Sequence, residues 1–200
     1  MSTAADPPAL HVIVLAAGAS RRFGSPKQLV RIRGQALLRL AVEHAAQVAG
    51  QAVTVVLGAH AAEIAPLLKA CSAAIVLNRA WAEGIASSIR AGLTSLPSSC
   101  DGVLLTLADQ PAVTSEDLRR LVAAWRRDPR CIVAAQYAAI LGVPAIFPRA
   151  QFPALLALRG DQGARALLNR GAAAVIGVPV PAAAVDIDRP EDLLDLPETS

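Results

Sequence analysis

Three cations gather beside a glycine in one short segment near the start of the chain. Arg21, Arg22 and Lys27 follow Gly18, and an apolar run of strand length at residues 11–14 precedes them. Glycine lets backbone N–H groups come close to a ligand, and several cations in one loop suit a polyanion. The pattern favours a buried strand that opens into a phosphate-binding loop, with a triphosphate as its natural ligand. An ordinary strand-to-helix loop with exposed arginines is the alternative.

The spacing within this loop separates it from two common phosphate-binding motifs. Five residues lie between Gly18 and Gly24. Lys27 follows a proline instead of a glycine, so the loop is not a Walker P-loop. The G-x-G-x-x-G spacing of a dinucleotide fingerprint is also absent. A dinucleotide-dependent oxidoreductase is therefore the least favoured enzyme class.

Carboxylates that could hold a metal ion follow at two later places. Asp109 stands just beyond an apolar run at residues 102–107. Magnesium binds through one or two carboxylates together with substrate phosphates, so a carboxylate at a strand end opposite a phosphate loop fits such a site. Asp186 and Asp188 flank Ile187, and in an extended segment both would point to the same side, where one could complete the site. Turn or capping chemistry is the alternative at all three aspartates.

The cysteines indicate neither a disulfide framework nor a zinc site. Cys71, Cys100 and Cys131 are odd in number, widely spaced and without a CxxC pair. The N-terminus also lacks the charged-then-apolar pattern of an export signal. We therefore expect reduced thiols and a cytoplasmic protein. The three histidines have no partner at a telling spacing, which favours core or surface roles for them.

Composition limits the class of protein. Of the 200 residues, 54% are hydrophobic and 18% charged, which predicts one compact domain over residues 1–200, with residues 1–10 as a flexible extension. The net charge is +3, but the basic residues are scattered and aromatic residues make up only 3%. We expect no nucleic-acid surface and, since no apolar run approaches the ~18 residues of a membrane span, no membrane partner.

The elements that must position these residues alternate along the chain. Strands are predicted at residues 53–57, 74–77, 102–107 and 131–136, and helices at residues 35–48, 61–69, 81–96 and 114–127. The last third is less regular, with strands at 143–147 and 175–178, short helices at 153–158 and 162–169, and a terminal helix beginning near Pro190. The alternation predicts a mostly parallel sheet with helices on both faces. In such folds ligands bind beyond the carboxyl ends of the strands, where the loops after Leu15 and Leu107 lie.

Several ordered motifs resemble those of one family, the MobA-like nucleotidyltransferases. Residues 15–24 followed by Lys27 resemble the LAAGxSxRxG…K signature of this family. Residues 78–88 resemble its N-x-x-W-x-x-G-x-x-x-S segment, and residues 108–114 resemble its DQP-x-V-T metal motif. The resemblance extends along nearly the whole chain.

Two later segments resemble one branch of that family, the molybdenum cofactor cytidylyltransferases (MocA-like). These are GDQGAR at residues 160–165 and DIDRPED at residues 186–192. The resemblance implies an α/β fold with a three-layer, mostly parallel, Rossmann-like sheet of the nucleotide-diphospho-sugar transferase type. It also implies a nucleotide-binding half over residues 11–110 and an acceptor-binding half over residues 111–200.

The resemblance further implies roles for individual residues. Arg22, Lys27 and Asp109 would be catalytic, the two cations by neutralising charge around the α-phosphorus and the pyrophosphate leaving group. Asp109 would hold Mg²⁺ with a second carboxylate, for which Asp188 is a better candidate than Asp186. Nucleotide-binding residues would be Leu15, Ala16, Ala17, Gly18, Ser20, Arg22, Lys27, Asn78, Gly84 and Ser88. Among these, Gly18 and Ser20 would lie near the phosphates, and the segment 84–88 near the base and ribose.

The implied reaction moves CMP from CTP to the terminal phosphate of molybdenum-bound molybdopterin. It would release pyrophosphate, form molybdopterin cytosine dinucleotide, and need no general base because a phosphate nucleophile is already ionised. Ala17 in LAAG favours CTP, since the guanylyl branch tends to have LAGG. A molybdoenzyme or its chaperone would receive the product.

One segment departs from the branch. Gly142-Val143-Pro144 stands where the branch usually has Gly-His-Pro, and the preceding residues 137–141 are more apolar than expected. Because this region should lie near the acceptor, two alternatives stay open. One is a nucleotidyltransferase that acts on another phosphorylated acceptor, such as a sugar or polyol phosphate. The other is a non-catalytic protein that carries the cofactor to a target enzyme.

Overall fold

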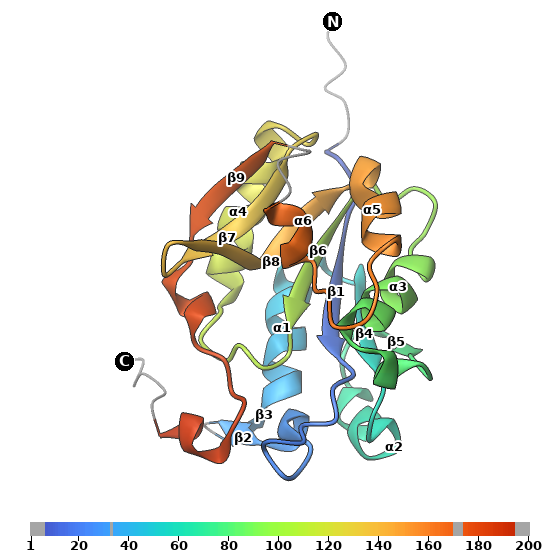
Figure 1. Ribbon diagram of the computed structural model, residues 1–200, viewed down its shortest axis with the longest axis vertical. Coiled ribbons are helices and arrows are strands. Elements are labelled where there is room, and N and C mark those ends of the chain that lie inside the picture. The colour runs from blue at the N-terminus through green and yellow to red at the C-terminus, as the bar shows by residue number, and fades with distance from the viewer. Residues whose placement is uncertain (1–6, 33, 170–173, 195–200) are drawn as a thin grey trace, which may run out of the picture.

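A seven-stranded sheet forms the centre of the computed structural model, which describes residues 7–32, 34–169 and 174–194 (Figure 1). The strands lie in the order β5-β4-β1-β6-β8-β7-β9. Their bounds are Leu10–Ala16 (β1), Val53–Leu57 (β4), Ala74–Leu77 (β5), Gly102–Leu107 (β6), Ile132–Tyr137 (β7), Ile140–Pro148 (β8) and Val175–Pro179 (β9). Neighbouring strands are parallel except at β8, which runs antiparallel to β6 and β7. The predicted mostly parallel sheet is confirmed.

Helices cover both faces of the sheet and complete the three layers. The helices on one face are α1 (Leu37–Ala49), α2 (Ala61–Ile64) and α4 (Ser115–Arg127), and those on the other are α3 (Ile85–Thr94), α5 (Phe152–Leu156) and α6 (Arg165–Leu168). Short 3-10 helices follow at Lys27–Leu29 (η1), Ala65–Leu68 (η2), Trp81–Glu83 (η3), Arg149–Gln151 (η4), Pro181–Ala184 (η5) and Pro190–Leu193 (η6). The small strands β2 (Arg31–Ile32) and β3 (Gln35–Ala36) pair with each other before α1.

The central strands are apolar at successive positions because helices cover both sides of them. Val12, Ile13 and Val14 of β1 are fully buried. Ile13 packs with α3 and α5 in one core cluster, whereas Val12 and Val14 pack with α1 and α4 in the other. Adjacent side chains of a strand point to opposite faces, so a strand between two helical layers must be apolar throughout.

Two predicted helices are interrupted by residues that do not fit an α-helix. The helix predicted at 61–69 is α2 followed by η2, and Pro66, which has no N–H to donate, lies in the second part. The helix predicted at 81–96 divides into η3 and α3 at Gly84, whose φ is +102°. This break turns the start of α3 toward the carboxyl ends of the strands.

The strand predicted at 143–147 is longer than expected and forms a hairpin with β7. Ala138 and Ala139 make the turn with φ of +46° and +63°. Two-residue hairpin turns require this left-handed conformation, which glycine and asparagine adopt most readily. Two alanines give no such signal, so the sequence did not reveal the hairpin.

The N-terminal end of the described chain is tied to the sheet. The expected flexible extension at residues 1–10 falls largely on residues 1–6, which lie outside the described part. The N–H of Ala9 donates to Asp101 Oδ2 at 2.8 Å, and β1 begins at Leu10. The predicted terminal helix is the 3-10 helix η6. Within the described residues, no helix has the length and apolar character needed to cross a membrane.

Candidate functional site

A cleft of about 540 Å³ opens at the carboxyl ends of β1 and β6. These two strands are adjacent and parallel, with Leu15 opposite Leu107, so the loops that follow them meet, as predicted. Residues that line the cleft are Leu15, Ala16, Ala17, Gly18, Ala19, Ser20, Arg21, Arg22, Lys27, Gln28, Leu37, Trp81, Ala82, Gly84, Ile85, Ser88, Leu107, Ala108, Asp109, Asp161 and Asp188. Every predicted site residue except Asn78 is among them.

The ammonium group of Lys27 lies between two carboxylates from distant parts of the chain. Lys27 Nζ donates to Asp109 Oδ2 at 2.6 Å, to Asp188 Oδ1 at 3.1 Å and to the carbonyl oxygen of Ile187 at 2.8 Å. The N–H of Ile187 in turn donates to the Asp109 carbonyl at 2.9 Å, which holds the C-terminal segment against the end of β6. The three charged groups predicted from separate motifs therefore form one cluster.

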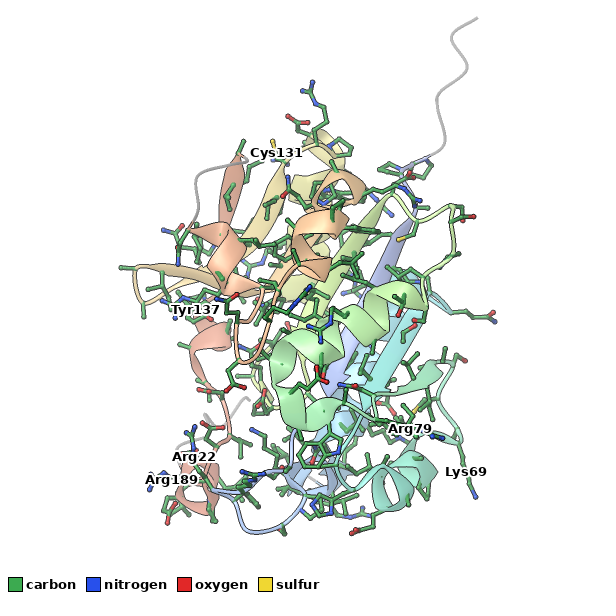
Figure 2. All side chains as sticks on the ribbon, turned by 45° about the vertical axis from the view of Figure 1, so that its right-hand side comes forward. Arg22, Lys69, Arg79, Cys131, Tyr137 and Arg189 are labelled. Atoms are coloured by element: carbon green, nitrogen blue, oxygen red, sulfur yellow. The ribbon has the colours of Figure 1, made fainter. Side chains whose placement is uncertain are left out.

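Arg22 approaches the same cluster from the mouth of the cleft. Its Nη1 donates to Asp188 Oδ2 at 2.8 Å, so both oxygens of Asp188 contact a cation. The Arg22 side chain is 70% exposed, whereas that of Lys27 is 15% exposed. Arg22 and Arg189 lie in the same lower corner of the molecule in Figure 2, and Arg22 lines the cleft. An anion entering the cleft would meet the exposed cation first and Lys27 deeper in.

Electrostatics keep Lys27 charged in this partly enclosed position. Burial by itself would lower the pKa of Lys27, but the charge and hydrogen bond of Asp109, together with those of Asp188, outweigh it and raise the pKa above its ordinary value. Partial burial, followed by the charges of Asp109 and Asp188, raises the pKa of Asp186. The site thus concentrates negative charge that a further cation would relieve.

One oxygen of Asp109 indicates where such a cation fits. Asp109 Oδ1 is buried and has no hydrogen-bond partner among the described residues. Buried polar atoms are usually satisfied, and an unpartnered carboxylate oxygen suits a hard divalent cation. Asp188 shares Lys27 with Asp109, whereas the side chain of Asp186 contacts no cation among the described residues. Among the described residues, no group of three or more His, Cys, Asp or Glu side chains could hold a metal ion. Phosphate oxygens of the substrate would therefore have to supply the remaining ligands.

The second wall of the cleft begins at the break between η3 and α3. Gly84, Ile85 and Ser88 line the cleft from this wall, and a side chain at position 84 would overlap the Gly160 carbonyl and the Asp161 carboxylate. The loop containing Asp161 therefore packs directly on the start of α3. Asp161 also lines the cleft, and it was not among the predicted site residues.

Asn78 lies behind this wall. Its Nδ2 donates to Ser87 Oγ at 2.8 Å and to Ser88 Oγ at 3.0 Å, and its Oδ1 accepts from the N–H of Ala80 at 3.0 Å. The side chain is 5% exposed. The hydrogen-bonding groups of Asn78 are already used within the protein. Asn78 therefore holds Ser88 in position instead of lining the cleft itself.

The segment that departs from the expected Gly-His-Pro lies outside the cleft lining. The carbonyl oxygen of Val143 accepts from Gln110 Nε2 at 3.4 Å. Gly142 packs against the hydroxyl of Tyr137, which leaves no space for a side chain at position 142. Burial raises the pKa of that hydroxyl. The histidines also lie away from the cleft lining: His11 bonds to Thr54, His44 to the Val113 carbonyl and His60 to Glu63.

Comparison with known proteins identifies one family. The family model described as the MobA-like NTP transferase domain matches residues 12–175. Nicotine blue oxidoreductase of Paenarthrobacter nicotinovorans is 31% identical over 82% of this chain and 84% of its own. Purine catabolism protein PucB of Bacillus subtilis is 29% identical over 92% of this chain and 94% of its own. The crystal structure of Rv0371C of Mycobacterium tuberculosis in complex with manganese is 28% identical, covers 96% of this chain and 99% of its own, and gives a TM-score of 0.77.

Proposed function

The chain belongs to the MobA-like NTP transferase family, and on that premise we propose that this nucleotidyltransferase moves CMP from CTP to molybdenum-bound molybdopterin. The products are pyrophosphate and molybdopterin cytosine dinucleotide. The observation that supports this most strongly is the position of Lys27 between Asp109 and Asp188, beside the glycine loop. A protonated cation and paired carboxylates beside a glycine loop suit nucleotidyl transfer, because positioning and neutralisation of charge on the triphosphate carry its rate.

The proposed reaction is an in-line displacement at the α-phosphorus of CTP. A phosphate oxygen of the acceptor forms a bond to that phosphorus, and the bond to the oxygen bridging the α- and β-phosphates breaks, releasing pyrophosphate. Arg22 and Lys27 neutralise charge that develops around the α-phosphorus and the leaving group. Gly18 and Ser20 place the loop against the phosphates.

Asp109 and Asp188 fit a magnesium site because Asp109 has a buried, unpartnered oxygen and both carboxylates share one cation. Magnesium, when bound, would supply positive charge to the triphosphate oxygens. The manganese complex of Rv0371C supports a divalent ion in this fold. Arg22 and Lys27 would then release Asp188 and turn to the phosphates.

The nucleoside end of CTP would lie deeper in the cleft. Leu15, Ala16 and Ala17 line the cleft at the end of β1, and Gly84 and Ser88 line the opposite wall, between which base and ribose would lie. In this proposal residues 11–110 hold the nucleotide and residues 111–200 the acceptor. The proposal includes a cytoplasmic location, which unpaired cysteines in the described chain support, with a molybdoenzyme or its chaperone as the acceptor of the product.

A second candidate acceptor is another phosphate monoester, such as a sugar or polyol phosphate. It is favoured by Val143, whose apolar side chain stands where the branch usually has a histidine. The two candidates share the nucleotide, the metal and every residue of the Lys27 cluster. They differ only in the acceptor that triggers pyrophosphate release.

The test is pyrophosphate release from CTP, GTP, ATP and UTP, each with and without molybdenum-loaded molybdopterin and with a panel of sugar and polyol phosphates. We expect release with CTP that depends on molybdopterin. Release only with a sugar or polyol phosphate would replace the first candidate by the second. Because one relative is named an oxidoreductase, NADH and NADPH oxidation are measured alongside, and cofactor oxidation without pyrophosphate release would contradict both candidates.

A further inference from the structure

The side chain of Gln28 is buried beneath the phosphate loop and is 2% exposed. Its Nε2 donates to the carbonyl oxygens of Ala16 at 2.9 Å and Gly18 at 3.1 Å. Its Oε1 accepts from Ser20 Oγ at 3.4 Å. One amide thus contacts the end of β1, the start of the loop and the loop apex, and the proposed reaction assigns it no role.

These contacts decide which backbone groups the loop presents to an anion. The carbonyl oxygens of Ala16 and Gly18 would repel a phosphate if they faced the cleft. The two N–H groups of a primary amide can occupy both carbonyls at once, so neither has to seek another donor. Because these carbonyls are held toward Gln28, the loop can present its N–H groups to the ligand, as anion-binding loops do.

The same amide is linked to Lys27 through Ser20. Ser20 Oγ accepts from the N–H of Lys27 at 3.2 Å while its hydroxyl faces Gln28 Oε1. Ser20 has a φ of +52°, a conformation that non-glycine residues rarely adopt, so the surrounding contacts must maintain it. The backbone from which the Lys27 ammonium projects is therefore fixed to the loop by the Ser20 and Gln28 side chains.

We propose that Gln28 is a positioning residue that shapes the loop for the triphosphate of the nucleotide and sets Lys27 against it. This inference rests on the proposed function, because it assumes that the loop binds the phosphates of a nucleoside triphosphate. In this role Gln28 would not act on the reacting atoms directly, although it lines the cleft. It acts through the Ala16 and Gly18 carbonyls and through Ser20.

The test compares two Gln28 variants with wild type. Gln28→Met keeps the side-chain length without hydrogen bonds, and Gln28→Glu keeps the shape but has no donors for the two carbonyls. Gln47→Met, on the exposed side of α1, is the matched control. Titration calorimetry measures the affinity for tripolyphosphate and for CMP, both with Mg²⁺, and thermal melts monitor folding. Steady-state assays give kcat and KM for CTP and for the acceptor.

We expect both Gln28 variants to lose about tenfold or more in tripolyphosphate affinity, while CMP affinity stays within about twofold. KM for CTP should rise and KM for the acceptor should not. Unchanged tripolyphosphate affinity would overturn the inference. A parallel loss of affinity for tripolyphosphate and for CMP that accompanies a lower Tm would also overturn it, because that pattern indicates a purely structural role for Gln28. If Gln28→Met does not fold, Gln28→Asn, whose amide is too short to reach both carbonyls, undergoes the same measurements.

The two proposals fail separately. If wild type releases no pyrophosphate from CTP but its tripolyphosphate affinity depends on Gln28, the proposed function fails and the role of Gln28 in the phosphate loop stands. If wild type turns over CTP and the Gln28 variants do so equally well, only the role given to Gln28 is wrong.

Discussion

We propose that Lys27 is the residue on which the chemistry of the site depends most. It is one of two lysines in a chain with 19 basic residues, and its ammonium contacts both proposed metal ligands. Lys69 lies on the opposite side of the lower molecule from Arg22 in Figure 2 and is absent from the cleft lining, so the two lysines give a matched pair of substitutions. Both variants remove one positive charge, but only one removes it from the cleft.

We predict that Lys27→Met lowers kcat for pyrophosphate release by about 100-fold or more, because a charge that stabilises the developing negative charge is lost. Lys69→Met should behave as wild type. Steady-state assays at saturating CTP and acceptor measure this. Equal effects of the two substitutions would show that the Lys27 charge is not used in the reaction.

The aspartates can be ranked by their contacts with cations. Asp188 shares Lys27 with Asp109, whereas Asp186 is paired with no cation among the described residues. We predict that Asp109→Asn and Asp188→Asn weaken Mn²⁺ binding in the presence of CTP by about tenfold or more. Asp186→Asn should leave it close to wild type, as measured by the electron paramagnetic resonance signal of free Mn²⁺. A larger loss of Mn²⁺ affinity in Asp186→Asn than in Asp188→Asn would make Asp186, not Asp188, the second metal ligand.

Some residues of the site could be predicted from sequence and others could not. Lys27, Asp109 and Asp188 were predicted to belong together from a glycine loop, a strand end and the family resemblance, and the structure brings their side chains into contact. Gln28 gave no signal, because a buried amide is recognised only by the carbonyls that it contacts in the folded chain. Asp161 belongs to a loop whose place beside Gly84 depends on packing between distant segments.

At the scale of elements, the strands were easier to predict than the breaks between helices. The bounds of β4, β5 and β6 follow directly from their apolar runs, and α4 begins where its cap predicts. The hairpin through Ala138 and Ala139 was not predictable, since alanine rarely adopts positive φ. The division of the third helical segment at Gly84 depends on the approach of the Gly160 loop, which no local pattern shows.

Gly84→Ala tests that division. The new methyl group would require a positive φ and would overlap the Gly160 carbonyl, so we expect the free energy of unfolding to fall by roughly 1–3 kcal/mol. KM for CTP should rise as the wall moves. At Gly163 a Cβ would meet only Ile85, at 3.8 Å, so Gly163→Ala is the control and should be tolerated. Urea denaturation measures both, and equal stability of the two variants would contradict the role of Gly84.

The first turn of α4 supplies a pH-dependent prediction. Burial would raise the pKa of Asp117, but hydrogen bonds from Thr114 and the neighbouring Arg120 outweigh it and lower the pKa below its ordinary value of 3.8. A lowered pKa contributes stability above pH 3.8 that is lost as the pH falls through the folded-state value. Asp117→Asn should therefore lower the free energy of unfolding by ~1 kcal/mol at pH 7, and the difference from wild type should shrink below pH 3.8. A difference that does not depend on pH in urea titrations would show that charge is not involved.

At the scale of the whole molecule, the fold brings one strand-end loop from the first half together with a segment close to the C-terminus. Asp188 reaches Lys27 and Arg22 because the chain after β9 returns along the carboxyl end of the sheet, as Figure 1 shows. Cys131 lies at the opposite end of the molecule from Arg22 in Figure 2. The cluster of Lys27, Asp109 and Asp188 thus lies at the carboxyl end of the parallel strands.

The most direct measurement follows the α-phosphate of CTP. The enzyme is incubated with CTP labelled at the α-phosphorus, Mg²⁺ and molybdenum-loaded molybdopterin, and the products are separated and counted. We predict that the label appears in a molybdopterin dinucleotide, with one pyrophosphate released for each label transferred, and that Lys27→Met abolishes both. Label that remains in CTP while molybdopterin is still bound, or that appears only as free CMP, would contradict nucleotidyl transfer to this acceptor.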